Sequence, residues 1–439
     1  MQIDKQTLKD LEIFKSEEGG VSLFDFINKT KTTGGKYRLQ EKLQHPPESL
    51  EKLKIQQEAV SYLIKNAGSF ILPFNDPQMK SVENYISTNI EPVISESLFE
   101  CLKFCIIDIQ AYRYLKNSLS EMAVFINSYY KLLEEKKEEL PECLKKIQKD
   151  LDFFIKNGIL KNILLLPKQK MFSFYQVLQA DRSLRTNLKS NLANIIQGYY
   201  EIDALLAMAR TTIDHHFEIP EFIENAESLF YAEGLYHPML ANAVPSNVSL
   251  NADLNFIFLT GPNMSGKTTL LKASGIAVYM AHLGMGVPAK NVKMTYFDRL
   301  FSSINITGNI LKGYSFFYSE VKRVKELAES LNKGEKVFSL FDELFRGTNV
   351  KDAYDASVLI ISGFARWRNS AFILSSHLWE LWENIKVYPN IKDLFFESEI
   401  DNGVPVFTYQ LISGVSDMRL GLKIIENEKI MDLLNPPQK

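Results

Sequence analysis

The stretch that decides the fold of the second half of the chain is Phe256-Ile-Phe-Leu-Thr260, followed directly by Gly261-Pro-Asn-Met-Ser-Gly266-Lys267-Thr268-Thr269. It consists of a short apolar run that favours β-structure, a turn with two glycines, and then a helical pattern. The turn fits the spacing G-x-x-x-x-G-K-[ST], which is typical of a phosphate-binding loop (P-loop) between a strand and a helix. A chance match is the alternative, and the strand and helix that flank the turn argue against it.

Each residue of this turn has a chemical role if the turn holds the phosphates of a nucleotide. Gly261 and Gly266 allow the backbone to curl so that its N–H groups point at the β-phosphate. Lys267 brings a cation to the β- and γ-phosphate oxygens, Thr268 offers a hydroxyl to Mg²⁺, and the positive end of the following helix adds to the attraction. We therefore expect nucleotide contacts along the whole loop, which comprises Gly261, Pro262, Asn263, Met264, Ser265, Gly266, Lys267, Thr268 and Thr269.

Two acids follow a second apolar strand. The run Lys336-Val-Phe-Ser-Leu-Phe341 leads directly into Asp342 and Glu343. At the end of a strand downstream of a phosphate-binding loop, Asp342 is expected to bind Mg²⁺ as the Walker B acid, together with Thr268. Glu343 is then placed to act as the base for the attacking water, or to orient it. Two adjacent acids carry little information alone, and the strand and the loop make this pair specific.

A third apolar run, Ser370-Ala-Phe-Ile-Leu-Ser-Ser376, ends at His377. A lone histidine most often packs in a core or lies on the surface. A histidine at the end of a strand in this sheet, however, is placed to sense the γ-phosphate, and we favour that role. The predicted catalytic residues are therefore Glu343, His377 and Lys267. Further on, Asn402-Gly403 predicts a type I′ turn between strands at 394–400 and 404–412.

Glycine use divides the chain into two parts. Residues 1–232 contain 7 of the 21 glycines, and residues 233–439 contain the other 14. The first part has apolar residues at helical spacing and predicts an all-α domain, whereas the second alternates strands with helices and predicts an α/β domain. A length of 439 residues suffices for two or three domains with cores of their own. We place the boundary near residue 232.

The bulk composition favours a globular protein of a reducing compartment. The chain is 46% hydrophobic and 23% charged. No apolar run reaches the ~18 residues that a membrane span needs. Its 3 cysteines are few and odd in number, which favours the cytoplasm. Cys101 and Cys105 lie four residues apart without further ligands nearby, so a packed helix face is favoured over a metal site. We expect a cytoplasmic protein without a membrane partner.

One long helix is predicted in the first part. Apolar residues recur there at steps of three and four, namely Leu184, Leu188, Leu192, Ile195, Tyr199, Ile202, Leu206 and Ala209. The pattern predicts a rod over residues 183–212, about 45 Å long at the rise of an α-helix. Such a rod can transmit position between distant parts of a protein, although a structural helical bundle shows the same stripe.

The segment that leads into this helix is locally basic, in a chain whose net charge is −3. Residues 156–190 have one acid, Asp181, and a net charge of +6 from Lys156, Lys161, Lys168, Lys170, Arg182, Arg185 and Lys189. Phe172, Phe174 and Tyr175 are interleaved with these cations. A solubility patch and a contact with a nucleic-acid backbone both explain this pattern.

Together these motifs resemble one family, the MutS-type ATPases of DNA mismatch repair and recombination. Gly261–Thr269 is similar to the Gly-Pro-Asn-Met-x-Gly-Lys-x-Thr loop of that family. Asp342-Glu343 followed by Arg346-Gly347-Thr348-Asn349 resembles its Asp-Glu-x-x-Arg-Gly-Thr-Ser, with Asn349 in place of Ser. Ser376-His377 resembles its Thr-His pair. In the first half, Leu11-Glu-Ile, Thr30-Lys-Thr-x-x-Gly35 and Leu43-x-His-Pro46 resemble the start of its helical core, so the resemblance covers nearly the whole chain.

The resemblance implies an α/β P-loop NTPase domain of the ABC type, preceded by an all-α core and lever domain whose tip lies at about 150–182. It implies ATP and Mg²⁺ as cofactors, and a head-to-tail homodimer in which Ser315 reaches the nucleotide of the partner subunit in trans. The levers lead to double-stranded or branched DNA, which would place the protein on the nucleoid, and other repair proteins are further expected partners. The expected DNA contacts are Lys168, Lys170, Arg182 and Arg185.

The sequence also departs from the family pattern. It begins in the core region, so we expect the mismatch-reading and connector domains to be absent and DNA shape to be recognised instead. Phe316 follows Ser315 where the family has Thr, Gly308-Asn309 replaces two aspartates, and no adenine-stacking aromatic is evident in Ala243-Val-Pro-Ser246. A second hypothesis is a nucleotide-gated scaffold that binds a protein partner without direct DNA binding. The net charge of −3 and the expected absence of the mismatch-reading domain favour it, and the basic segment at 156–190 opposes it.

Overall fold

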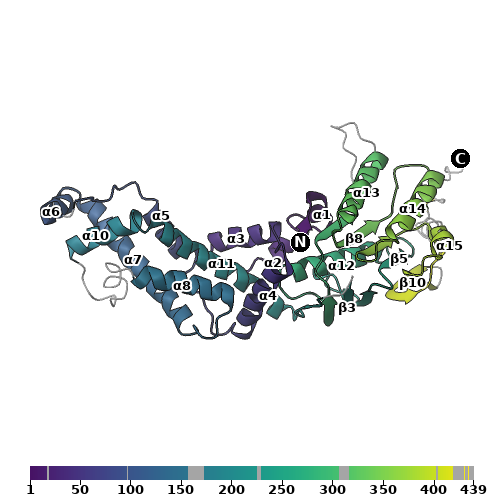
Figure 1. Ribbon diagram of the computed structural model, residues 1–439, viewed down its shortest axis with the longest axis horizontal. Helices are drawn as coiled ribbons and strands as arrows, with labels where there is room; N and C mark the ends of the chain where they lie inside the picture. Colours follow the sequence, from purple (N-terminus) through teal and green to yellow (C-terminus); the bar gives the residue numbers. More distant parts are fainter. Residues whose placement is uncertain are drawn as a thin grey trace, which may run out of the picture. The chain divides into compact units, whose positions relative to one another are not determined.

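The computed structural model describes residues 1–16, 19–95, 97–156, 173–224, 229–305, 316–401 and 404–418, together with residues 430 and 434. The chain divides into two compact units (Figure 1). Unit 1 contains Met1–Phe26, His45–Leu53 and Asp214–Lys439, and unit 2 contains Ile27–Gln44 and Lys54–Ile213. Within the described residues, every helix is too short or too polar to span a bilayer.

Unit 1 is built on a seven-stranded sheet with the order β1-β7-β8-β9-β5-β10-β11 (Figure 1). Neighbouring strands from β1 to β10 in this order are parallel, and β11 is antiparallel to β10. The strands are β1 (Gln2–Ile3), β5 (Phe256–Thr260), β7 (Arg299–Ser303), β8 (Val337–Asp342), β9 (Ala371–Ser375), β10 (Ile391–Asp401) and β11 (Val404–Ser413). The strands predicted before the glycine turn, before the two acids and before His377 are thereby confirmed, as are the two strands of the predicted hairpin.

The three central strands are buried along their whole length. Every residue of β5, β8 and β9 is buried, including Asp342 at the end of β8. Strands of a parallel sheet that is covered on both faces are continuous apolar runs without alternation. This explains why the sequence around the predicted site reads as three short blocks of large apolar residues.

Helices cover both faces of this sheet. On one face, Gly275 of the helix that follows the glycine turn packs against β8, since a Cβ added to this glycine would lie 2.7 Å from Leu340. On the other face, the ring of Phe364 lies 5.7 Å from that of Phe341, which neighbours Leu340 and therefore points to the opposite side. The helix on the first face is α12 (Lys267–His282), and those on the second are α13 (Phe316–Asn332) and α14 (Val350–Phe364).

A smaller sheet in unit 1 has four strands in the order β2-β6-β3-β4. They are β2 (Glu221–Phe222), β3 (Phe230–Leu235), β4 (Ser246–Leu250) and β6 (Asn291–Met294). The sequence does not predict this sheet, because two of its strands are too short to show a period. This sheet matters for the site because the segment between β3 and β4 lines the same pocket as the glycine turn that follows β5.

The first residues of the chain also belong to unit 1. β1 extends the main sheet beside β7 and is followed by α1 (Lys5–Asp10). The Asp10 carboxylate accepts hydrogen bonds from the Ser302 hydroxyl at 2.6 Å and from the backbone N–H groups of Ile304 at 3.0 Å and Asn305 at 3.1 Å. The predicted single boundary near residue 232 therefore differs from the observed division, in which the helical unit ends at Ile213 and excludes Met1–Phe26.

Every secondary-structure element within the described residues of unit 2 is a helix. The ring of Tyr199 is 5.2 Å from that of Phe125 and 5.1 Å from that of Tyr129, and its hydroxyl donates to the carbonyl of Phe74 at 2.8 Å. The helices that are wholly or mainly in this unit are α3 (Thr33–Gln44), α4 (Leu50–Lys65), α5 (Asp76–Ile86), α6 (Leu98–Ile107), α7 (Ile109–Glu134), α8 (Glu142–Lys156), α10 (Phe174–Arg185) and α11 (Lys189–Asp214).

The prediction of one continuous helix over residues 183–212 is wrong. The chain leaves the helical conformation after α10, at Thr186 with φ −116° and ψ −83°, and α11 begins at Lys189. The apolar stripe continues across this break because Leu184 and Leu192 are both buried. Periodicity in a sequence reports which side of a segment is buried and does not report whether its backbone is continuous. The 26 residues of α11 form a rod of about 39 Å.

Candidate functional site

The carboxyl ends of three adjacent strands bring the predicted site residues together. β9 lies between β5 and β8 in the sheet, and all three are parallel, so they end at the same edge. The glycine turn follows β5, Asp342 ends β8 with Glu343 directly after it, and His377 lies two residues beyond β9. Residues that are far apart in the sequence therefore meet at one edge of the sheet.

The backbone of the Gly261–Gly266 turn requires its glycines. Gly261 has φ 137° and Gly266 has φ 107°, both in the region that residues with a Cβ rarely adopt. Gly266 is the N-terminal cap residue of α12, so the first N–H groups of that helix face the turn. Met264 has φ 69° and is 75% exposed, which places this apolar side chain on the outside of the turn.

Lys267 is held over the turn that precedes it. Its ammonium donates hydrogen bonds to the carbonyl of Gly261 at 2.7 Å and to that of Pro262 at 3.0 Å. Burial lowers the pKa of Lys267, and the carboxylates of Glu343 and Asp342 offset only part of this effect. Within the described residues Lys267 forms no salt bridge, although the carboxylates of Asp342 and Glu343 lie nearby. An anion such as a phosphate would satisfy it.

Thr268 and Asp342 form the oxygen-rich part of the site. The Thr268 hydroxyl donates to Asp342 Oδ2 at 2.8 Å, and the Ser375 hydroxyl donates to Asp342 Oδ1. Hydroxyl and carboxylate oxygens are the ligands that Mg²⁺ prefers. No group of three or more His, Cys, Asp or Glu side chains arranged for a metal ion occurs within the described residues. The donor set therefore fits Mg²⁺ held by one carboxylate, one hydroxyl and the phosphates of a nucleotide.

Glu343 is the centre of a second cluster of polar contacts. Its Oε2 lies 3.1 Å from His377 Nδ1 and 2.8 Å from Arg346 Nε. Burial raises the pKa of Glu343, but the hydrogen bond from His377 and the charges of Arg346, His377 and Lys267 outweigh it, so the pKa is below its usual value. The hydrogen bond to Glu343 in turn raises the pKa of His377, against the effect of burial. The pair favours a carboxylate beside an imidazolium.

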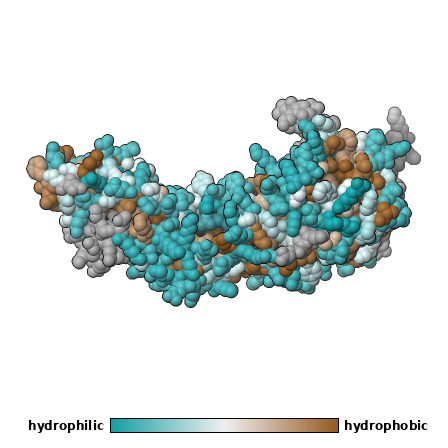
Figure 2. Space-filling model, in the orientation of Figure 1, coloured by the Kyte–Doolittle hydropathy of each residue, from teal (hydrophilic) through white to brown (hydrophobic). Residues whose placement is uncertain are grey.

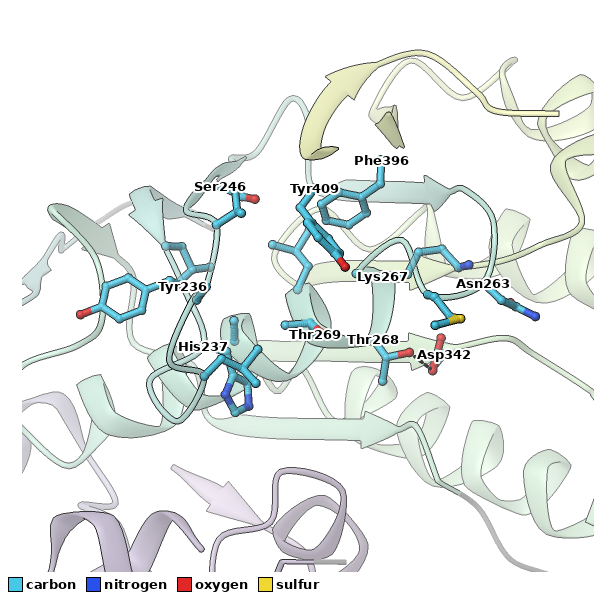
Figure 3. A pocket seen from close by; sticks show the side chains of 18 of the residues that line it. Tyr236, His237, Ser246, Asn263, Lys267, Thr268, Thr269, Asp342, Phe396 and Tyr409 are labelled. Atoms are coloured by element: carbon cyan, nitrogen blue, oxygen red, sulfur yellow. Dashed lines mark hydrogen bonds between the residues drawn. The ribbon is translucent and has the colours of Figure 1, made fainter. Parts of the chain in front are cut away.

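One end of a pocket of about 990 Å³ is lined by Lys267, Thr268, Asp342, Glu343 and Arg346 (Figure 3). Lys267, Thr268 and Asp342 lie at this end, whereas Tyr236 and His237 lie at the other, and Phe396 and Tyr409 lie beside each other over the turn. The volume is in the range of small-molecule and cofactor sites. The pocket therefore offers a polar, cation-bearing end with the rings of Phe396 and Tyr409 above it, and an opposite end with Tyr236 and His237.

His237 is a half-buried, uncharged residue at the end of the pocket opposite Lys267. Its Nδ1 is buried and has no hydrogen-bond partner within the described residues. Burial, assisted by the charge of Lys272, lowers the pKa of His237 to about 4. A neutral imidazole does not attract the phosphates of a bound ligand, so His237 does not extend the cationic end of the pocket.

Sequence reasoning missed several residues of the site, including Tyr236 and His237 at the far end of the pocket. Phe396 and Tyr409 come from the hairpin of β10 and β11, which pairs with β5 although it lies over 100 residues away in the chain. No local pattern signals that proximity. Ser375 could have been found as the polar residue at the end of an apolar strand, and Arg346 as the cation of the Asp-Glu-x-x-Arg motif. The rings of the hairpin, and not residues 243–246, are the aromatic groups over the turn.

The other predicted contacts are spread through the chain. Ser315, Lys168 and Lys170 lie outside the described residues. Arg182 is a partly buried residue of α10. The guanidinium of Arg185 is buried: Nε donates to Asp181 Oδ1 at 2.7 Å, Nη2 pairs with Asp181 Oδ2, and Nη1 donates to the carbonyl of Ile90. Arg185 therefore ties α10 to the segment that follows α5 and is not a surface cation.

Two family models match the chain. A model described as MutS domain III matches residues 6–312, which is more than half of the chain, and a model described as MutS domain V matches residues 257–433. The second range contains the glycine turn, the two acids and His377, and thus the described polar end of the pocket.

Known proteins resemble the chain over part of its length. The DNA mismatch repair protein MutS of Bacillus subtilis is 29% identical over 232 residues, which cover 52% of this chain and 26% of that protein. The MutS protein of Thermosipho melanesiensis is 26% identical over 64% of this chain and 36% of its own length, and DNA mismatch repair protein MSH3 of Candida glabrata is 28% identical over 54% and 24%. The matched region thus spans between a quarter and just over a third of these relatives. Given the extent of the family-model matches, the chain belongs to the MutS family.

Proposed function

We propose that unit 1 is a P-loop NTPase of the ABC type that binds and hydrolyses Mg·ATP. The observation that carries this proposal is the meeting of Lys267, the Thr268–Asp342 pair and the Glu343–His377 pair at one edge of the sheet. A cation, a metal site and an acid paired with an imidazole are the groups that phosphoryl transfer to water uses. MutS family membership supports the same reading.

Each group has a role in this reaction. Lys267 and the N–H groups at the start of α12 would bind the β- and γ-phosphates, and Thr268 and Asp342 would hold Mg²⁺. When bound there, Mg²⁺ would supply positive charge next to the phosphate oxygens. Glu343, whose lowered pKa keeps it ionised, would orient the attacking water, while the His377 imidazolium would lie near the γ-phosphate. Tyr236, His237, Phe396 and Tyr409 would enclose the base and ribose.

The first experiment measures ATP turnover and ATP binding in the same variant. Glu343→Gln should lower kcat by about 100-fold or more, because a positioned acid or base contributes that much. It should still bind Mg·ATP, because Lys267 and Thr268 are unchanged. Glu383→Gln, an exposed acid of unit 1 that pairs with Lys386, is the control and should keep the normal rate. Normal turnover by the Glu343→Gln protein would remove Glu343 from the mechanism.

We further propose that two chains form a head-to-tail dimer whose composite ATP sites control the helical units on double-stranded or branched DNA. The names of the relatives support a role in DNA metabolism. Lys168, Lys170 and Arg182 remain the candidate phosphate contacts. Arg185 is not a candidate, because its guanidinium is buried in a pair with Asp181. Charge reversal there would break this pair and damage the fold.

DNA binding is tested by charge reversal at the three candidate cations. The Lys168→Glu, Lys170→Glu, Arg182→Glu protein should bind duplex and branched DNA more weakly, and the slope of log affinity against log salt should fall by about one for each cation that no longer binds a phosphate. The matched control reverses three exposed cations of unit 1, Lys325, Lys351 and Lys386. Equal losses of affinity in the two proteins would show that only net charge matters. The panel should include homoduplex, mismatched and four-way-junction DNA, with and without ATP.

One observation favours the second candidate function, a nucleotide-gated scaffold for a protein partner. Apolar residues of α6 and its flanks are exposed, at the end of unit 2 that is hydrophobic in Figure 2: Ile94, Leu98, Phe99, Leu102, Ile106, Ile107 and Ile109. This stripe lacks the excess of cations that DNA requires and is typical of a protein-binding surface. The two functions differ in one measurement, since stimulation of ATP hydrolysis by DNA is expected only for the first.

A further inference from the structure

Glu320 in the second turn of α13 is a buried acid in an unusual environment. It is 4% exposed, and its Oε2 has no hydrogen-bond partner within the described residues. Burial raises its pKa, and the backbone N–H groups of Gly347, Arg346 and Phe345 and the charge of Arg346 act in the opposite direction without cancelling the effect. A buried carboxylate without a close salt bridge lowers stability unless local dipoles hold it. The groups that hold it here are N–H dipoles of the turn after Glu343.

The turn that faces Glu320 has the backbone of an anion-binding nest. Glu343 and Phe345 have φ values of 59° and 62°, which turn successive N–H groups toward one side. The first turn of α13 packs closely on the same segment. The ring of Phe317 is 5.6 Å from that of Phe345, and a Cβ added to Gly347 would lie 2.6 Å from the backbone nitrogen of Phe317. The start of α13 and the turn are therefore fitted to each other.

The same turn holds Glu343 in place. Arg346, whose backbone N–H faces Glu320, extends its side chain back to the site. Its Nε lies 2.8 Å from Glu343 Oε2, and its Nη2 donates to the carbonyl of Asp342 at 2.9 Å. A short series of contacts thus runs from Glu320 through the backbone and side chain of Arg346 to Glu343. A shift of the start of α13 would press on the turn, because Phe317 packs directly against Gly347 and Phe345.

We propose that Glu320 is a positioning residue that couples the start of α13 to Glu343 of the same chain. The inference rests on the proposed head-to-tail dimer and on the role that the family resemblance implies for Ser315, which immediately precedes α13 in the sequence and would reach the nucleotide of the partner subunit. A partner nucleotide that shifts the start of α13 would then alter the alignment of Glu343 in the other composite site. This gives a physical route by which the two ATP sites of a dimer regulate each other.

The first test compares kcat with the Kd for Mg·ATP. Glu320→Ala removes the acceptor from the nest and should lower kcat by about 10- to 100-fold, as expected for a misplaced catalytic group, while the Kd changes less than about twofold. Glu320→Gln keeps the shape and one acceptor oxygen and should lose less activity. Glu329→Ala, an exposed acid on the same helix, should behave as wild type. A parallel loss of kcat and affinity would indicate general damage and overturn the proposal.

Mixed dimers show on which site Glu320 acts. Lys267→Ala disables one composite site, so the second mutation can be placed on either subunit. When Glu320→Ala is on the subunit with the intact Lys267, the active site contains the altered chain's own Glu343, and turnover should fall. When Lys267→Ala and Glu320→Ala are on the same subunit, the one working site takes Lys267 and Glu343 from the unaltered chain. The altered chain contributes only the region of Ser315 to that site, so the fall in turnover should be small. A larger fall in the second arrangement would overturn the proposed route.

The outcomes also separate this inference from the proposed function. A wild-type protein that does not hydrolyse Mg·ATP would contradict both. An active wild type whose Glu320→Ala and Glu329→Ala variants have the same kcat would contradict only the role of Glu320. If circular dichroism shows that Glu320→Ala does not fold, Glu320→Gln carries the test against Glu329→Gln, and an unchanged kcat then overturns the proposal.

Discussion

At the scale of single residues, Glu343 has a backbone conformation that residues with a side chain rarely adopt. A φ of 59° costs on the order of 1–2 kcal/mol relative to ordinary conformations. The N–H of Glu343 donates to the carbonyl of Ser375 at 2.9 Å, and Arg346 and His377 contact its carboxylate. These interactions offset the strain. The left-handed conformation turns the chain at the end of β8 and directs Glu343 toward His377.

The Glu343–His377 pair predicts a specific titration. The pKa of His377 should lie above its usual 6.5 in the native protein and should fall below 6.5 in Glu343→Gln, because burial and the charges of Lys267 and Arg346 then act alone. Because the pKa of His377 is raised and that of Glu343 is lowered, the pair's contribution to stability is full between the usual pKa of a carboxyl and pH 6.5. It is lost as pH rises through the pKa of His377, or falls through that of Glu343. NMR titration of the imidazoles measures this directly.

His237 is an internal control in the same titration. Its pKa of about 4 means that it should remain neutral at pH 6, in the wild type and in Glu343→Gln alike. An unchanged pKa of His377 in Glu343→Gln would show that the two side chains do not interact in solution.

Gly347 predicts a steric effect next to the site. A Cβ there would lie 2.6 Å from Phe317 N and 2.8 Å from Phe316 Cδ1, so Gly347→Ala should destabilise the protein by about 1–3 kcal/mol and reduce kcat. Gly363 is the matched control, because it lies in α14 with no atom within 4 Å of the added Cβ. Gly363→Ala should instead stabilise by about 0.4–1 kcal/mol. Urea denaturation gives both values, and equal effects at the two glycines would contradict the packing argument.

At the scale of elements, one arginine of α13 joins three parts of unit 1. The guanidinium of Arg323 donates to Asp4 Oδ1 and Oδ2 at 2.9 Å, to the Thr7 hydroxyl at 2.9 Å, and to the carbonyl of Ser302 at 2.7 and 3.0 Å. It also lies 3.9 Å from the centre of the Phe301 ring. The residues around α1 are thereby fastened to α13 and β7, which explains why the N-terminal residues belong to the unit with the main sheet.

Arg323→Met should destabilise unit 1 by about 3–5 kcal/mol, because it leaves Asp4 without its closest cation and several buried acceptors unpaired. The control is Lys325→Met on the exposed side of the same helix. Its contact with Glu329 is 3.7 Å and solvent-exposed, so its loss should change stability by less than about 1 kcal/mol. Chemical denaturation followed by fluorescence measures both. Similar values for the two variants would mean that the Arg323 contacts do not stabilise the fold.

At the scale of the whole molecule, the pocket belongs entirely to one of the two units. All the residues that line it are in unit 1, whereas unit 2 has a separate aromatic core around Tyr199. A ligand stabilises the cooperative unit that binds it. Two units with cores of their own should therefore respond differently to nucleotide.

Hydrogen exchange of Glu343→Gln with Mg·ATP at 100 times its Kd should show this difference. The slowest amides of β5, β8 and β9 should gain about 2.7 kcal/mol of protection, whereas those of α11 should gain little. A protein that also carries Lys267→Ala is the control and should show no gain at the same ATP concentration. Equal protection in both units would mean that the chain unfolds as one cooperative body.

The sequence alone determined those features that depend on local physics. The glycines of the turn, the apolar strands before the acids and before His377, and the helical nature of unit 2 all follow from backbone preferences and from burial patterns within short segments. The tertiary structure decided everything that depends on contacts between distant segments. Examples are the rings of Phe396 and Tyr409 over the turn, the place of α1 beside β7, the break between α10 and α11, and the buried pair that removes Arg185 from the surface. The physical reason is that a local pattern records whether a side chain is buried, whereas only the folded chain decides which groups bury it.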